Sequence, residues 1–539
     1  SCFEQINHGL FAQNNSVLSN GDWYKISTNK NGIYRLEYSD FKDLGVNVSN
    51  LQTAAIKLYG NGGGMLPKLN SDFRYSDLTE NAIKVYDANN NGFFEDGDYI
   101  LFYGMSANVW SFNANNNLFE HEIHLFADEV NYFITIDNQF NGKRINEREL
   151  LQNPTETITT YNTYALHEEE LENLIQSGSK WFGERFSYDS KQSFSFSLPD
   201  LIQSDYVNIK IAAAARSLQA SSFTVDVNSS FLANLSVPVV SPQYAKEYAK
   251  EVSAKTQYLA STSNLGIDIE YSSLDNGAEG WLNYIEINAR RELKLIGNSL
   301  AFRDVASLGN TIGQYRIENG IGLEVWDVTE PTNVVRLVTS ITANNLTFND
   351  SLNVLHEYIA FNTSGHLTPN LKGSVLNQNI HNTSANTEFI IVCHPDFLSA
   401  ADRLANFHLE KDDIISVVVT PQQIYNEFSS GMQDVSAIRD FLKFQYDKQD
   451  SQFKYLLLFG DGSFDPKNRI ANNTNYIPTY QSVNSTHPTD SYVTDDYFGL
   501  LDDDEGLFNN DLVDIGIGKG RRLVSHSFLE KGKFLGLFA

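Results

Sequence analysis

The chain has 539 residues, 41 % of them hydrophobic, and its 67 acidic residues outnumber its 39 basic ones to give a formal charge of −28. A chain longer than about 250–300 residues exceeds a single hydrophobic core, so we expect about three or four domains. The acidic surplus would repel a phosphate backbone, so nucleic acid is excluded as an expected partner.

Cysteine use and the N-terminus add little to this picture. The two cysteines, Cys2 and Cys393, predict no disulfide framework and do not fix the redox compartment. No segment approaches the roughly 20 apolar residues that cross a bilayer. The opening residues include neither an initiator Met nor the apolar core of a signal peptide, so we expect an N-terminus internal to a longer product.

Residues 1–150 are predicted to form a β-rich domain. Residues 21–38 alternate polar and apolar side chains around Asn31-Gly32, the dipeptide that most favours a tight hairpin. The glycine-rich segment 59–69 lacks the Lys-Ser/Thr pair of a phosphate-binding loop, and no helix-forming run follows it. We therefore interpret that segment as a flexible turn.

Residues 87–98, "DANNNGFFEDGD", have the spacing of a calcium loop. A hard cation needs about six to eight oxygens from a loop that turns sharply after its fifth residue. The predicted ligands are four side chains and one main-chain carbonyl, namely Asp87, Asn89, Asn91, Asp98 and the carbonyl of Phe93. The flanks are typical of strands, so we expect structural calcium between strands. The alternative is an Asn- and Asp-rich turn without metal.

Residues 151–361 are predicted to form a β-sandwich, because they contain short runs with period-two alternation. In "YVNIKI", Val207, Ile209 and Ile211 would face a core, while the residues between them face water. Residues 362–387 are polar and contain many Asn, Gly and Pro, so we expect a linker.

The pattern changes after residue 388. "FIIVC" and "IISVVV" are continuous β-branched runs, each followed by a helical signal, which is typical of a sheet buried on both faces. Helix starts are expected at Pro395, at Thr420 with a capping box to Gln423, and at Asp434. Alternating strands and helices with short connections predict parallel, right-handed crossovers.

The run "LLLFGDG" stops at Gly460 and Asp461, which we expect at the carboxyl edge of this sheet, where α/β proteins bind ligands. Asp465, Asp495 and Asp496 are expected to gather there with Asp461 and could bind metal or a basic substrate group. We expect Gly460, Asp461, Asp495 and Asp496 to form the floor of a substrate site. Ordinary surface turns would explain the same residues. For residues 500–511 we favour a solvated acidic loop.

No reactive pair emerges from the residues alone. Cys393 and His394 adjoin, but successive strand residues point to opposite faces. A thiol there is more often a small core residue. His408 is expected to pack on a helix face, and His487 and His526 have no evident cysteine partner. We therefore assign no catalytic residue.

Several ordered motifs resemble the first half of a gingipain-type cysteine peptidase domain: "FIIVCHPDF", "PQQIYNEFSSGMQDVSAIRDFLK", "YLLLFGDGSFDP" and "DLVDIGIGK". With "SNGDWYKISTNKNGIYRLEY" and "IKLYGNGGGMLPKLN", the likeness runs from about Ser16 to Gly518 and is to the surface sortases of the type IX secretion system. The resemblance implies β-rich domains followed by a partial caspase-like α/β domain over residues 388–539. It also implies hydrolysis or transpeptidation through a His and Cys pair.

The resemblance further implies partners and a location. These are protein cargo with C-terminal sorting domains, outer-membrane secretion components and lipopolysaccharide as acceptor, at the extracellular face of the outer membrane. In the family the reactive His and Cys lie downstream of the segment matching "DIGIGK". Here "GRRLVSHSFLEKGKFLGLFA" follows, with no Gly-His-Gly-like turn and no cysteine, so we expect a truncated or frame-shifted, inactive chain. The rivals are a non-catalytic surface-binding module and a calcium-dependent adhesin.

Overall fold

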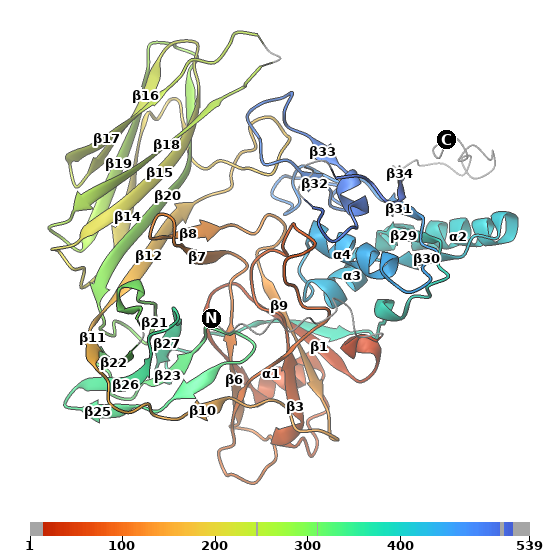
Figure 1. Ribbon diagram of the computed structural model, residues 1–539, viewed down its shortest axis with the longest axis horizontal. Helices are drawn as coiled ribbons and strands as arrows, with labels where there is room; N and C mark the ends of the chain where they lie inside the picture. Colours follow the sequence, from red (N-terminus) through yellow and green to blue (C-terminus); the bar gives the residue numbers. More distant parts are fainter. Residues whose placement is uncertain (1–14, 244–245, 310, 507–510, 521–539) are drawn as a thin grey trace.

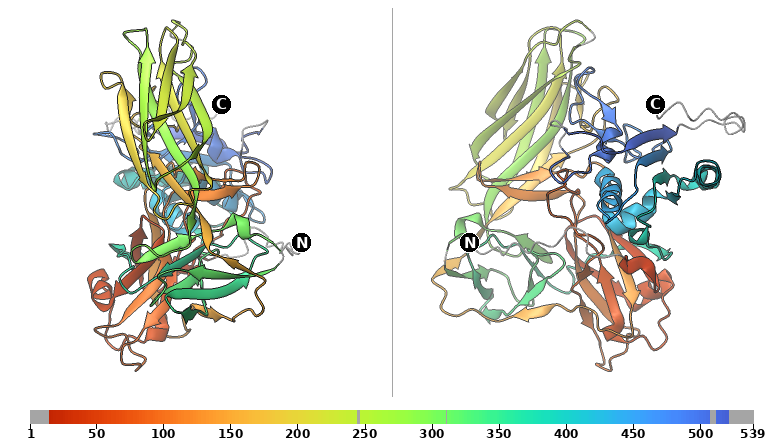
Figure 2. Two further views of the ribbon diagram at one scale, coloured as in Figure 1. Left: turned by 90° about the vertical axis from the view of Figure 1, so that its left-hand side faces the viewer. Right: turned by 45° about the vertical axis from the view of Figure 1, so that its right-hand side comes forward.

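The structure, a computed structural model, describes residues 15–243, 246–309, 311–506 and 511–520. Figure 1 shows β-rich bodies below, a tall β-sandwich at the upper left and an α/β body at the right, which holds all but one of the labelled helices. The two views of Figure 2 place the sandwich above the other β-rich bodies, with the α/β body beside them.

The N-terminal body consists of two sheets and one helix. Its first sheet has the order β28-β1-β9-β3-β4 and its second the order β2-β6-β5. The elements of this body are β1 (Trp23–Thr28), β2 (Gly32–Glu37), α1 (Tyr38–Leu44), β3 (Ile56–Tyr59), β4 (Glu80–Asn81), β5 (Lys84–Tyr86), β6 (Tyr99–Gly104), β9 (Val130–Ile136) and β28 (Asn370–Val375). The hairpin β7 (Val109–Asn113) and β8 (Leu118–Glu122) projects from it toward the sandwich.

The prediction of a hairpin at Asn31-Gly32 is wrong. β1 pairs with β9 and β28, whereas β2 pairs with β6, so the chain changes sheets at this turn. Neither residue has a positive φ, which a type I′ turn would require of both. Instead the Asn31 side chain accepts a hydrogen bond from the Ser106 N–H at 2.7 Å, and a Cβ on Gly32 would lie 2.7 Å from Leu367.

The segment 362–387 is not only a linker. Its residues 370–375 form β28, which pairs antiparallel with β1 through partners such as Trp23 and Val375. Its short 3-10 turn Ile380–Asn382 buries both Ile380 and His381. The polar composition that suggested a linker is explained by β28 lying at the edge of its sheet, where its side chains are exposed or half-buried.

The upper β-sandwich buries alternate residues of its strands. Its sheets have the orders β12-β20-β15-β18, with β13 beside β20, and β14-β19-β16-β17. The strands are β12 (Thr160–Glu168), β13 (Arg185–Phe186), β14 (Lys191–Ser197), β15 (Tyr206–Arg216), β16 (Ser221–Val227), β17 (Ser230–Val237), β18 (Lys250–Leu259), β19 (Asn264–Ser273) and β20 (Glu279–Glu292). The alternation predicted for "YVNIKI" is confirmed, since Val207, Ile209 and Ile211 are buried in the core between the sheets.

A smaller pair of sheets lies below the sandwich and has its own core. The sheets have the orders β11-β22-β26-β25 and β10-β24-β23-β27-β21. The strands are β10 (Asn146–Arg148), β11 (Glu156–Ile158), β21 (Ser299–Phe302), β22 (Ile312–Ile317), β23 (Glu324–Asp327), β24 (Val335–Leu337), β25 (Ser340–Thr342), β26 (Asn345–Ser351) and β27 (Tyr358–Phe361). The residues between 151 and 361 thus build two layered bodies.

The α/β body contains a parallel sheet of order β30-β29-β31-β34. Its elements are β29 (Phe389–Cys393), α2 (Leu398–Asp412), β30 (Ser416–Val419), α3 (Pro421–Phe428), α4 (Val435–Tyr446), β31 (Tyr455–Phe459) and β34 (Gly516–Gly520). Helix α2 packs on one face and α3 with α4 on the other, which is why the central strands β29 and β31 are apolar throughout. The predicted capping box of Thr420 with Gln423 and the cap at Asp434 are both present.

The glycine-rich segment is not a flexible turn, because it begins a stretch of chain that is bound to the α/β body. This stretch, residues 61–77, is called the clasp segment below. The Leu66 N–H donates to Asp434 at 3.0 Å, and Arg74 forms a buried ion pair with Asp440 of α4. Within the described residues, no helix is long and apolar enough to span a membrane.

Candidate functional site

The carboxyl ends of β29, β31 and β34 meet at one edge of the parallel sheet, called the rim below. Cys393 pairs with Phe459, and Phe459 pairs with Gly520, so these strands end in register. The loops that follow β31 cover this edge and include the short strands β32 (Tyr480–Gln481) and β33 (Val493–Thr494). The predicted carboxyl edge is therefore present where the sequence placed it.

Gly460 begins the turn after β31. It has φ +157°, and a Cβ there would lie 2.8 Å from the Tyr476 Cβ, so only glycine fits. The Asp461 carbonyl accepts hydrogen bonds from the N–H groups of Tyr476 and Ile477 at 2.9 and 3.1 Å. The turn is thereby held against the returning loop, and the half-buried Asp461 side chain lies at the rim.

The other predicted floor residues differ in role. One Asp495 carboxylate oxygen accepts from the Thr479 hydroxyl at 3.0 Å and from the Lys519 ammonium of β34 at 2.9 Å. Asp496 begins a 3-10 turn and is exposed. Asp465 is fully buried and pairs with Arg469, so it supports the loop rather than the floor. Asp461, Asp495 and the exposed Asp496 are the predicted floor carboxylates that could contact a substrate.

Cys393 is a core residue. Its side chain has no exposure, and its Sγ donates to the His394 carbonyl at 3.2 Å. Burial raises the pKa of the thiol to about 12, which suppresses the thiolate needed for nucleophilic attack. The His394 imidazole accepts a hydrogen bond from the Asp396 N–H and packs edge-on against Tyr476. These two neighbours therefore form no dyad.

The other histidines considered from the sequence do not provide a general base for Cys393. His408 contacts the Phe389 ring and bonds Asp412 of the same helix at 2.7 Å. His487 bonds the Thr489 hydroxyl at 2.9 Å in the loop after β32. His526 and Cys2 lie outside the described residues, as does the segment 521–539 from which a reactive turn was expected to be missing.

The predicted calcium loop lies between β5 and β6, and Gly92 turns it with φ +83°. The side chains of Asp87, Asn89 and Asn91 accept hydrogen bonds from main-chain N–H groups of the loop itself. The buried Asp98 carboxylate accepts from two further N–H groups, both at 2.8 Å. This donor set fits a hard cation in chemistry and spacing, because a carboxylate or amide oxygen retains a lone pair after one hydrogen bond.

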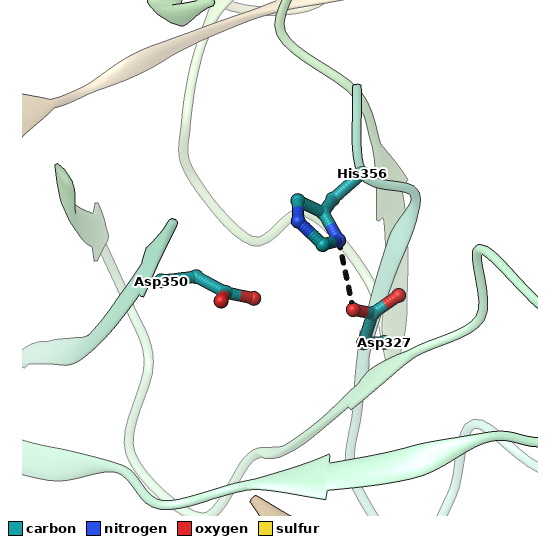
Figure 3. Close-up of side chains that lie close together, drawn as sticks. All are labelled: Asp327, Asp350 and His356. Carbon is teal, nitrogen blue, oxygen red and sulfur yellow. Dashed lines mark hydrogen bonds and ion pairs between the residues drawn. The ribbon is translucent and has the colours of Figure 1, made fainter. Parts of the chain in front are cut away.

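Two acidic clusters among the described residues were not predicted. In the first, Asp327, Asp350 and His356 offer ligand atoms within 4.8 Å of one another, and Figure 3 shows the three side chains facing a common centre. The Arg148 guanidinium bonds Asp327 at 2.8 Å and Asp350 at 2.5 Å, so a cation already neutralises the cluster. Burial alone would raise the pKa of Asp327, but hydrogen bonds from His356 and Thr329 lower it to about 2.

The second cluster is Asp502, Glu505 and Asp514, in the region expected to be a solvated loop. Its carboxylates accept hydrogen bonds from nearby main-chain N–H groups, including those of Leu501 and Leu512. Part of this loop, 507–510, lies outside the described residues. Neither cluster could have been found from sequence spacing, because each joins residues from separate strands or turns.

The α/β body is the part of the chain that matches a known family. Residues 382–524, which contain the whole parallel sheet, match the sequence profile of peptidase family C25. Among solved structures, the chain is similar to dimeric latent PorU from Porphyromonas gingivalis, with a TM-score of 0.80 and 24 % identity over 94 % of this chain and 48 % of that chain. The expected gingipain-type resemblance and fold class are confirmed. The chain spans about half the length of that PorU chain.

Other similarities are far weaker. The CBM36-1 domain of a multidomain xylanase from the hindgut metagenome of Trinervitermes trinervoides matches with a TM-score of 0.17 and 10 % identity, over 23 % of this chain and 96 % of its own. A CBM36 module in complex with calcium and xylotriose matches with a TM-score of 0.15 and 10 % identity, over 23 % of this chain and 98 % of its own. Scores this low carry no structural argument. No curated protein matches the chain.

Proposed function

We propose that residues 382–520 are the first part of a C25-type cysteine peptidase domain, whose reactive imidazole and thiolate come from chain downstream of β34. The observation that carries the proposal is the family match over the parallel sheet. Because Cys393 is buried and neither cysteine of the sequence follows β34, this chain would supply the floor of the site and not its nucleophile.

The sheet geometry supports this division. In the described residues β34 lies at the edge of the sheet, so a following strand can pair with its free side. A right-handed parallel crossover would bring the carboxyl end of that strand to the rim, beside Lys519 and Asp495. Catalytic groups on such strand ends would therefore face Gly460 and Asp461 across the rim.

In the proposed reaction the imidazole is the general base and the thiolate attacks a peptide carbonyl of the substrate. Main-chain N–H groups stabilise the oxyanion, and the leaving amine takes a proton from the imidazole. The thioester that results is resolved by water in hydrolysis or by an amine in transpeptidation. The residues described here would help to orient the peptide, because the half-buried Asp461 and the Asp495–Lys519 pair lie at the rim.

For the full-length protein we propose a sortase of the type IX secretion system. It would cleave C-terminal sorting domains from secreted cargo and join the new C-terminus to lipopolysaccharide at the cell surface, together with outer-membrane secretion components. The support for this is the likeness of nearly the whole chain to PorU, including its β-rich bodies. The calcium loop would stabilise the N-terminal body.

A thiol-reactive peptidyl probe tests the proposal. This chain should show no adduct at Cys393 by intact mass. The product of the reading frame extended past codon 539, or past a corrected frameshift near codon 519, should be labelled and should cleave a cargo protein at its C-terminal sorting domain. Labelling of Cys393, or an extended product without cysteine-dependent cleavage, would contradict it.

A non-catalytic surface-binding module is the second candidate, and the inert, buried Cys393 favours it for this chain taken alone. The same experiment separates the two. If no extension of the reading frame restores labelling while the chain still binds a partner, the binding module is the better account.

A further inference from the structure

Two cavities of 450 and 500 Å³ lie where the sandwich, the N-terminal body and the α/β body meet. They share the wall residues Met65, Glu122 and Leu125, so they are adjacent, and together they are called the junction groove below. The first cavity borders the sandwich and the second borders α4 and β32. Each is within the size range of pockets that bind ligands.

A β-bulge places an unpartnered acceptor in the wall of the first cavity. Ala212 pairs with Tyr284 but Ala213 pairs with Leu282, so Asn283 of β20 is the extra residue. A bulge turns its side chain out of the regular alternation, and bulges are frequent beside binding sites. Asn283 is only 7 % exposed, and its Oδ1 has no hydrogen-bond partner among the residues that the structure describes. A buried carbonyl oxygen without a partner is costly unless a ligand or water donates to it.

The second cavity contains a similar acceptor. Gln481 of β32 is 5 % exposed, and its amide nitrogen faces the carbonyls of Ser463 and Phe464. Within the described part of the chain, the Gln481 Oε1 has no hydrogen-bond partner. The wall that the two cavities share includes Glu122, whose exposed carboxylate forms no ion pair with any residue the structure describes. All three groups accept hydrogen bonds, and the carboxylate adds negative charge.

The cations of the groove are mostly committed to other partners. Lys180 pairs with Glu251, and the His121 imidazole lies between Glu168 and Glu286 at 2.8 and 2.6 Å. Lys68 lies over the Tyr480 ring at the far end of the second cavity, 5.9 Å from its centroid. The centre of the groove therefore favours a ligand that donates hydrogen bonds and carries positive charge.

Apolar side chains form much of the second cavity, which Lys68, Asp434 and Ser436 also line. The apolar residues include Met65, Leu66, Leu125 and Val435, and Phe73, which also lines this cavity, is 78 % exposed. The exposed Phe73 ring is therefore accessible to an apolar side chain of a bound ligand.

We propose that the junction groove binds an extended peptide of a protein partner, in which a lysine or arginine lies next to an apolar side chain. The apolar side chain packs on Met65, Leu66 and Phe73. The cationic head pairs with Glu122, and main-chain or side-chain N–H groups donate to Asn283 and Gln481. Binding of this peptide does not depend on peptidase activity.

Fluorescence polarisation with the labelled peptide GLFKKLG tests this proposal, with GLFEELG as the charge-reversed probe. We expect saturable binding of the first peptide and at least tenfold weaker binding of the second, about the effect of losing one charged hydrogen bond. Glu122→Lys should weaken binding of GLFKKLG by at least tenfold and improve binding of GLFEELG. Asn283→Leu and Gln481→Leu should each weaken GLFKKLG severalfold.

Glu410→Lys is the matched control, because Glu410 is exposed on α2 and the charge change is the same. It should leave binding unchanged, which separates a local contact from the effect of net charge. Glu122→Lys changes an exposed residue, and its thermal midpoint should equal that of the parent chain. Equal loss in Glu410→Lys, equal affinity for both peptides, absence of binding, or displacement of the peptide by lipopolysaccharide alone would each overturn the proposal.

Discussion

The clasp segment should stabilise the α/β body through the ion pair between Arg74 and Asp440. The two side chains are 3 % and 2 % exposed, and Arg74 also donates to the Leu69 carbonyl within its own segment. Removing one partner of a buried pair leaves an uncompensated charge and typically costs about 3–5 kcal/mol. Because the Arg439 guanidinium also lies 3.7 Å from Asp440, we expect Arg74→Met to cost about 3 kcal/mol, the low end of that range.

Native-state hydrogen exchange measures the loss of local stability in the α/β body, residue by residue. The amides of α4 should lose about 3 kcal/mol of protection in Arg74→Met, while those of β15 in the sandwich should keep theirs. Burial raises the pKa of Asp440, and without Arg74 that pKa rises further. As the pH falls, Asp440 therefore takes up a proton in the folded state at a higher pH than in the unfolded state. Protonation removes the uncompensated buried charge, so the stability lost in Arg74→Met should shrink as the pH falls.

Two further variants serve as controls, one that removes both buried charges and one that removes an exposed ion pair. Replacing both partners, Arg74→Met with Asp440→Leu, should recover most of the lost protection, because an apolar pair of similar size leaves no buried charge. Arg185→Met removes a pair with Glu279 whose side chains are 47 % and 26 % exposed, and should cost less than about 1 kcal/mol. Unchanged α4 protection in Arg74→Met, or a double variant as weak as the single one, would refute the reasoning.

Three further predictions concern titration, metal and reactivity. Burial alone would lower the pKa of His121, but hydrogen bonds to two glutamates raise it to about 9. The stability this provides should be complete below pH 6.5 and be lost as the pH rises through about 9, so thermal midpoints of the parent and His121→Gln should converge there. A chelator should lower the midpoint of the parent by a few degrees and leave Asp87→Ala unaffected, and equal midpoints for the parent with and without chelator would remove the calcium site. A small alkylating thiol reagent should modify Cys393 only after denaturant unfolds the α/β body, and rapid modification of the native chain would contradict its placement in the core.

The parallel sheet could be predicted because its signals are local. A strand buried on both faces needs an unbroken apolar run, and "FIIVC" supplies one. The caps at Thr420 and Asp434 act within three residues of the chain, so they too follow from sequence. The turn at Asn31 failed because its outcome depends on Ser106 and Leu367, which are distant in the chain.

In the candidate site, too, features with local sequence signals could be predicted and features that depend on distant residues could not. Gly460 and Asp461 were found because a glycine–aspartate turn ends an apolar strand. The pairing of Asp495 with Lys519 was not, because it joins the loop after β33 to β34, and these segments belong to different sheets. Asn283 gave no signal at all, since a bulge is defined by the partner strand and not by its own residue.

The β-sandwich is part of the support of the rim. The Ser179 N–H donates to the Ser482 carbonyl at 2.9 Å, and the Lys180 N–H donates to the Ser485 hydroxyl at 2.8 Å. These bonds hold the loop between β32 and β33, which pair with each other, and β33 leads directly into Asp495. The position of the Asp495 carboxylate therefore depends on contacts made by the β-sandwich, which is distant in the sequence. The residues of the α/β body alone are thus not sufficient to position the rim.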